Sequence, residues 1–227
     1  LNALSSSQLS QLNTSGIASL STAVIAGLGA NAASYLSSSQ VKGLTAGELN
    51  SISSSAITQL NTSGIAGLST AVVAGLVSNT LNALSSSQLS QLNTSGIAGL
   101  TTAALSGLGT SAASSMSSAQ VLALSASQLN SMSSAALSNL NSSGLANLSG
   151  TVIAGLSSGN LNSLMARFTT PQQVLGLSAA QINTLNSTNI SSLASGVAQV
   201  LSTAVVAGLN STTLNTLNSN AIAQLNT

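Results

Sequence analysis

Serine is the side chain in this sequence that most often serves as a nucleophile in enzymes, and it occurs throughout the chain. A serine hydroxyl becomes reactive when a neighbouring base takes its proton, and histidine, the usual base, is absent. Lys42 is the only amine side chain, and Glu48 is the only carboxylate, which excludes the carboxylate pair of glycosidases. We therefore expect no catalytic residues and no enzymatic activity.

The chain also lacks the residues that hold metals, phosphates and nucleic acids. Histidine and cysteine, which zinc and other transition metals prefer, are both missing. Glycines recur at the repeat corners, at Gly16, Gly64, Gly96 and Gly144. No lysine follows them as in a phosphate-binding loop, so we interpret them as room for the backbone to turn. Two cations, Lys42 and Arg167, are too few to displace counterions from a phosphate backbone. The sequence predicts no metal, no cofactor and no nucleic-acid partner.

The remaining candidates for binding are single residues. Arg167 and Phe168 lie in the one segment that interrupts the repeat described next, and they form a candidate contact loop for a neighbouring subunit or a ligand. A tolerated surface loop is the alternative. We expect Tyr35 to be a packing residue, with stacking against a sugar as the alternative. Lys42 and Glu48 are close enough in sequence to pair, but an exposed pair contributes only about 0–1 kcal/mol.

An eight-residue repeat, the octad, carries all of these residues except Arg167 and Phe168. Two apolar residues three positions apart recur every eight residues, as in Leu1/Leu4, Ile65/Leu68 and Ile153/Leu156. The second is Leu, Ile or Met in all 28 octads, and the residue after it is Ser, Thr or Asn in 23 of them. Each apolar pair can be buried only against neighbouring octads, which is typical of a solenoid.

Polar residues between the apolar pairs favour a helix in each octad. Three positions after the Ser or Thr, a Gln or Glu often follows, at Gln8, Gln40, Glu48, Gln88, Gln120, Gln128 and Gln181. This spacing is a capping box, which marks a helix start. Pro171 also stands where the first helical residue is expected, a position that favours proline. The sequence predicts one short helix and one corner per octad.

A continuous helix and a β-strand are the two other interpretations of the octad. In one continuous helix, eight residues at about 100° each would rotate the apolar stripe steadily around the helix, which leaves no buried face. A strand places residues three apart on opposite faces. We therefore predict an all-α solenoid of very short helices, with a β-solenoid as the alternative because Gly, Ser, Thr and Asn are common in its corners.

A longer period lies above the octad. Residues 1–18 recur letter for letter at 81–98, a shift of 80 residues or ten octads. The third such block contains five additional residues, 165–169. We predict one domain, in which the octad solenoid covers 1–164, a loop is inserted at 165–169, and the same solenoid continues over 170–227.

The consensus of the octads, seen in Leu124–Leu129, resembles Ser/Ala/Thr-rich octapeptide-repeat arrays, Leu-Ser/Thr-x-x-Gln-Val/Ile-x-x, of large secreted or surface proteins of bacteria. The resemblance covers nearly the whole chain. It implies an adhesin-like or matrix role and does not name a ligand.

The composition predicts the behaviour of the surface. Charged residues make up 1% of the chain and its net charge is +1, so copies of it do not repel one another, and near-zero charge promotes association. We expect a structural protein, extracellular or on the cell surface, that self-associates into a homopolymer: a filament, sheath or layer. The alternatives are an adhesin stalk or carbohydrate-binding module for cell-surface glycans, and an ice-binding protein. No apolar run reaches the roughly 18 residues of a membrane helix, so we predict no transmembrane segment. Because the sequence starts and stops within the pattern, we interpret it as a piece of a longer chain.

Overall fold

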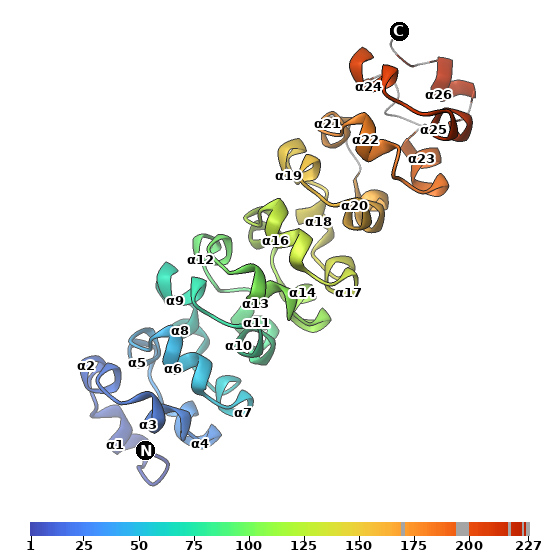
Figure 1. Cartoon of the computed structure of the whole chain (residues 1–227). Coiled ribbons are helices and arrows are strands. Elements are labelled where there is room, and N and C mark those ends of the chain that lie inside the picture. Colours follow the sequence, from blue (N-terminus) through green and yellow to red (C-terminus); the bar gives the residue numbers. More distant parts are fainter. Residues whose placement is uncertain (169–170, 194–199, 218, 224, 226–227) are drawn as a thin grey trace. The chain divides into compact units, whose positions relative to one another are not determined.

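The computed structural model describes residues 1–168, 171–193, 200–217, 219–223 and 225. These residues form many short α-helices and the 3₁₀ helix η1, with no strand among them (Figure 1). Helices that are neighbours in space come from different octads along the chain. The protein is therefore an all-α helical solenoid, as predicted, and the β-solenoid alternative is wrong.

The chain divides into two compact units. The first comprises Leu1–Leu124 and Ser131–Asn141, and the second Ser125–Asn130 and Ser142–Thr227. The helices of the first unit are α1 (Ser6–Ser10), α2 (Thr14–Ala18), α3 (Thr22–Ala26), α4 (Ala30–Ser34), α5 (Ser38–Lys42), α6 (Ala46–Ser51), α7 (Ser54–Ile57), α8 (Thr62–Ala66), α9 (Thr70–Ala74), α10 (Ser78–Ala83), α11 (Ser86–Leu89), α12 (Thr94–Ala98), α13 (Thr102–Ser106), α14 (Thr110–Ser115), α15 (Ser118–Leu122) and α17 (Ser134–Ser138).

The second unit contains the five-residue insertion. Its elements are α16 (Ala126–Ser131, all but its last residue), α18 (Ser142–Leu145), α19 (Gly150–Ala154), α20 (Ser158–Leu164), the 3₁₀ helix η1 (Met165–Arg167), α21 (Pro171–Val174), α22 (Ala179–Ile182), α23 (Ser187–Leu193), α24 (Thr203–Ala207), α25 (Ser211–Thr216) and α26 (Ser219–Ala223). The prediction of one domain continuing through the insertion stays a prediction. Within the described ranges, no helix combines the length and the apolar character needed to cross a membrane.

Capping residues start the helices at the predicted positions. All seven predicted Gln and Glu residues accept a hydrogen bond from the backbone N–H of the Ser or Thr three positions earlier, and their own N–H groups donate to its hydroxyl. Asparagines cap the helix start in other octads; for example, the Asn13 side chain accepts a hydrogen bond from Gly16 N–H. Each cap satisfies backbone donors that a helix start leaves unpaired, so helices of only four to seven residues can recur.

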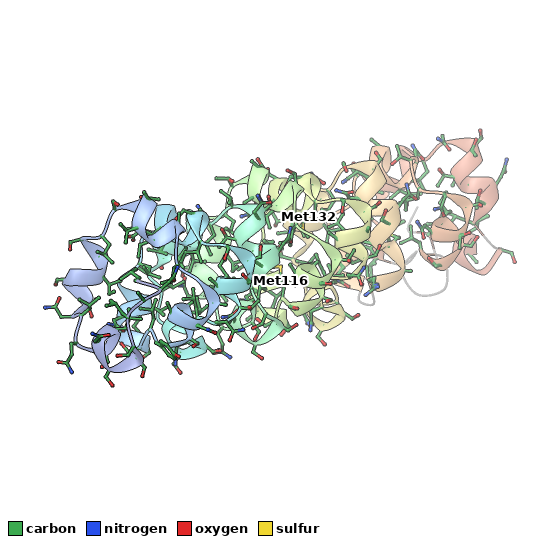
Figure 2. All side chains as sticks on the ribbon, turned by 90° about the horizontal axis from the view of Figure 1, so that it is seen from below. Met116 and Met132 are labelled. Atoms are coloured by element: carbon green, nitrogen blue, oxygen red, sulfur yellow. The ribbon has the colours of Figure 1, made fainter. Side chains whose placement is uncertain are left out.

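The apolar pairs form the core of each unit. In the first unit, every second member of a pair from Leu28 to Leu140 is at most 8% exposed, methionines included. Met116 and Met132 take the place of leucine and lie among the packed side chains within the ribbon (Figure 2). The burial of Ala33 and Ala113 shows that the octads with a small first member keep the same register. The predicted inward stacking of the pairs is confirmed from Leu28 to Leu140, whereas Ile222, in the last octad, is 49% exposed.

Helices three octads apart pack against each other in the first unit, as α3 does with α6, α4 with α7 and α9 with α12. Hydrogen bonds between successive turns of the solenoid, which we call coils, join residues 23 to 31 positions apart in the first unit. A coil therefore takes slightly more than three octads. Three coils of about 27 residues match the 80-residue block to within one residue, which explains why the block contains ten octads rather than a multiple of three or four.

Glycines inside the helices allow the coils to approach closely. Gly64 and Gly96 are the third residues of α8 and α12 and do not lie at corners, and no glycine in the described ranges has a positive φ. A Cβ atom added to Gly64 would lie 2.5 Å from the Cβ atom of Val41, and one on Gly96 would lie 2.4 Å from that of Val73. Our interpretation of these glycines as room for the backbone to turn is therefore wrong. They provide space for a valine from the preceding coil.

Candidate functional site

The predicted contact loop is packed against its own unit. η1 follows α20 directly, and its first residue, Met165, is buried. The Arg167 Nη1 atom donates a hydrogen bond of 2.9 Å to the Ser142 hydroxyl, and Phe168 is half-buried. Met165 and Phe168 line a cavity of about 90 Å³, together with Ala166, Val174, Ser192 and Leu193. Thr169, the last inserted residue, lies outside the described residues. A contact role for Arg167 and Phe168 stays a prediction.

The insertion replaces one octad in its coil. The Asn162 side chain bonds the backbone of Thr184 and Asn186, which are 22 and 24 residues further on. Equivalent asparagines elsewhere bond residues 25 and 27 further on. The difference of three residues is that between an eight-residue octad and the five inserted residues. The insertion is thus part of the wall of the solenoid and shortens one coil.

The two opposite charges of the first unit do not meet. Glu48 is 3% exposed, and its Oε2 atom accepts from the backbone N–H and the hydroxyl of Thr45, each at 2.7 Å. Lys42 is exposed, and its aliphatic stem lies over Gly67 of the next coil. The hypothesis that Lys42 and Glu48 pair is therefore wrong. Tyr35 differs from expectation as well, because it is 44% exposed and is not a packing residue.

Buried glutamines connect the coils, a role that sequence reasoning missed. The Gln88 side chain is 1% exposed, and its Oε1 atom accepts from Ser85 N–H within the capping box. Its Nε2 atom donates to the carbonyls of Ile57 and Leu60 in the preceding coil, each at 2.9 Å. Gln40 and Gln120 make the same pair of bonds to residues 31 and 28 positions earlier. Each glutamine thus starts one helix and joins it to the coil before.

Asparagines form a second set of bonds between coils, which we call the asparagine clamps. The Asn82 Nδ2 atom donates to the carbonyl of Gly107, and its Oδ1 atom accepts from Gly109 N–H, at 2.9 and 2.8 Å. The same pair of hydrogen bonds to the following coil is made by five other asparagines: Asn2, Asn50, Asn130, Asn162 and Asn183. Asn82 and Asn2 are equivalent in successive 80-residue blocks, so the recurrence of asparagine after the first apolar residue was a usable signal.

One polar hollow lies between two coils of the first unit. It measures about 400 Å³ and is lined by Asn50, Ile52, Ser53, Ser54, Asn79, Asn82 and Ala83. These residues come from the end of α6, the start of α7 and the exposed side of α10. We call this feature the polar hollow.

The residues that line the polar hollow and the described part of the insertion, 165–168, include no His, Cys, Asp or Glu. No group of three or more His, Cys, Asp or Glu side chains that could hold a metal occurs in the part of the chain that the structure describes. The polar hollow is lined by amides, hydroxyls and alkyl groups, which bind uncharged partners through hydrogen bonds and do not activate a nucleophile. A scan against protein-family models finds no match to the chain, and a search of curated proteins finds no similar sequence.

Proposed function

We propose that this chain is a structural protein, secreted or displayed on a cell surface, whose solenoids associate into a filament, sheath or layer. The observation that carries the proposal is the repeated bonding of coil to coil by neutral amides. Gln88 and Asn82 show the pattern, in which side-chain amides hold backbone groups of the adjacent coils. Such bonds are insensitive to salt, which suits a protein exposed to an uncontrolled medium.

The surface supports association between copies. Its outward positions carry mostly Ser, Thr, Asn, Ala and Gly, and the net charge of the chain is +1. Glu48 is buried, so Lys42 is the exposed charged side chain of the first unit. Arg167, in the second unit, is half-buried. Because long-range repulsion is nearly absent, short-range hydrogen bonding and packing between solenoids are unopposed. The resemblance of the octads to secreted and surface repeat arrays agrees with this location.

The test is the assembly state of the purified chain over a range of concentrations. We expect large assemblies by light scattering and filaments or sheets by electron microscopy. Because surface charge contributes so little, we expect the same result at low salt and at about 1 M salt, where the Debye length falls to about 3 Å. A monomer at every concentration and both salt conditions would refute the proposal.

A charged variant sharpens this test. Ser63, Ala103 and Ala119 are exposed positions on α8, α13 and α15. Replacing all three with glutamate adds repulsion between copies, and we expect it to dissolve the assemblies at low salt and to restore them partly at high salt. The matched control replaces the same three residues with glutamine, which has similar volume and no charge. Loss of assembly in both variants would indicate a steric effect and would remove the argument from charge.

A further inference from the structure

The polar hollow presents hydrogen-bonding groups that the fold does not use. Asn79 and Ser54 are exposed on its walls, and neither the Asn79 amide nor the Ser54 hydroxyl has a hydrogen-bond partner among the described residues. An amide offers two donors and an acceptor, and a hydroxyl offers one donor and two acceptors. Both kinds of group therefore face solvent inside one concave surface of about 400 Å³, within the size range of small-ligand sites.

Two other residues of the polar hollow are held rigidly by the fold. The Asn50 Oδ1 atom accepts from Val77 N–H and from the Thr80 hydroxyl, and its Nδ2 atom donates to the Gly75 carbonyl. Asn82 is fixed in the same way to the coil that follows. The Asn50 bonds join the two coils that form the polar hollow, and the Asn82 bonds tie the second of these coils to the one after it, so the walls keep their spacing without a ligand. A preorganised site loses less entropy when it binds.

The lining of the polar hollow includes two apolar side chains, Ile52 and Ala83, and no charged residue. Ile52 is 6% exposed. A neutral sugar matches this combination, because its ring carries C–H faces for the apolar side chains and hydroxyls that both donate and accept. Anionic and cationic ligands have no counter-charge in the polar hollow. We propose that the polar hollow binds a neutral saccharide, with Asn79 and Ser54 contacting its hydroxyls.

A column of helices extends the site toward Tyr35. α4 packs against α7, and α7 packs against α10, so the three helices follow one another along one side of the first unit (Figure 1). Tyr35 caps the C-terminal end of α4 and is the only aromatic residue of this unit. Aromatic faces pack well against the C–H faces of sugars, and Tyr35 ends α4, the helix that packs against α7. Tyr35 thus marks the direction in which a longer saccharide would extend from the polar hollow.

Binding to neutral disaccharides tests the proposal, using the full chain and saturation-transfer NMR with lactose, cellobiose and N,N′-diacetylchitobiose. We expect at least one to bind saturably, with a Kd on the order of 1 mM because the exposed contacts are few. Asn79→Leu fills the polar hollow and should weaken binding about tenfold, the equivalent of one lost contact of about 1.4 kcal/mol. Ser63→Leu is the matched control, since it places the same side chain at the equivalent exposed position of α8.

The outcomes separate cleanly. If no disaccharide shows saturation up to about 50 mM, or if Asn79→Leu binds as tightly as the unchanged chain, the saccharide site is wrong. Tyr35 is the only tyrosine in a chain without tryptophan, so its fluorescence reports on α4 alone. A tetrasaccharide of the bound sugar should change this fluorescence and the disaccharide should not; no change with either removes the extension to Tyr35. The site does not depend on assembly, and a monomeric chain can be tested in the same way.

Discussion

Two replacements of Gln88 distinguish the two roles of the buried glutamines, which are to cap a helix and to join two coils. Gln88→Leu keeps the side-chain volume but removes three hydrogen bonds, one from Ser85 N–H and two to the carbonyls of Ile57 and Leu60. Gln88→Glu keeps an oxygen for Ser85 N–H, and glutamate is a good residue at the third helical position. It has no amide N–H to give to the preceding coil.

The expected cost follows from the groups left without partners. A buried backbone group that loses its partner costs about 1–3 kcal/mol. Ile57 O still accepts from Leu60 N at 3.1 Å, so its loss is partial. The additional apolar burial of leucine offsets about 1–2 kcal/mol. We expect Gln88→Leu to lower the free energy of unfolding by about 2–4 kcal/mol, and Gln88→Glu to lower it by at least as much.

The assay is urea unfolding followed by circular dichroism, with hydrogen exchange measured on peptides from residues 53–92. Exchange is needed because repeat proteins can unfold locally, coil by coil. We expect faster exchange in both the α7 and the α11 coils, since the lost bonds join them. Gln91→Leu is the control: this exposed glutamine lies in the same octad, and its replacement should change stability by no more than about 0.5 kcal/mol. If Gln88→Glu were as stable as the unchanged chain, only the cap would matter, and our account of coil joining would be refuted.

Three further predictions use the same unfolding assay. Glu48→Gln supplies the side-chain amide that other octads have at this buried position, and the amide can donate to the carbonyls of Ile17 and Leu20, which lie 31 and 28 residues earlier. It should stabilise the chain by about 1–2 kcal/mol, and a loss of stability would show that this coil differs from its neighbours. Gly96→Ala places a methyl group 2.4 Å from the Cβ atom of Val73 and should lower the free energy of unfolding by about 1–3 kcal/mol. Gly47→Ala, where nothing lies within 4 Å, should raise it by about 0.5–1 kcal/mol, and equal effects of the two variants would contradict the close approach of the coils. Asn82→Ala breaks an asparagine clamp and should cost about 1–3 kcal/mol, while Asn79→Ala on the same helix should be nearly neutral, and the reverse order would disprove the clamp.

The local structure of the octads could be predicted from the sequence because its causes are local. A polar cap such as Ser85, a glutamine three residues later and an apolar residue after that define a helix start within five positions. Because a corner follows every helix, the apolar pairs all lie on the same side of their helices, and their burial inside the solenoid could be predicted. These features depend on residues a few positions apart, which a sequence shows directly.

The contacts between coils could not be predicted in the same way, because they depend on how many octads make one turn. Without that number, Gln88 looks like a cap alone, and nothing in the sequence pairs it with Ile57, 31 residues earlier. Gly96 was misinterpreted for the same reason, since its neighbour Val73 belongs to another coil. The polar hollow is also formed by two coils and has no signature in either segment.

Ten octads in three coils give the chain a way to change its length. A block of 80 residues takes close to three whole coils, so the surface pattern of the first unit returns to nearly the same bearing around its axis after one block, and Asn2 and Asn82, one block apart, make the same bonds to the following coil. Duplicating a whole block would lengthen the protein and leave every lateral partner in phase. Adding a single octad would instead turn everything beyond it by about three-tenths of a revolution. Growth by block is therefore neutral for side-to-side contacts, and growth by octad is not.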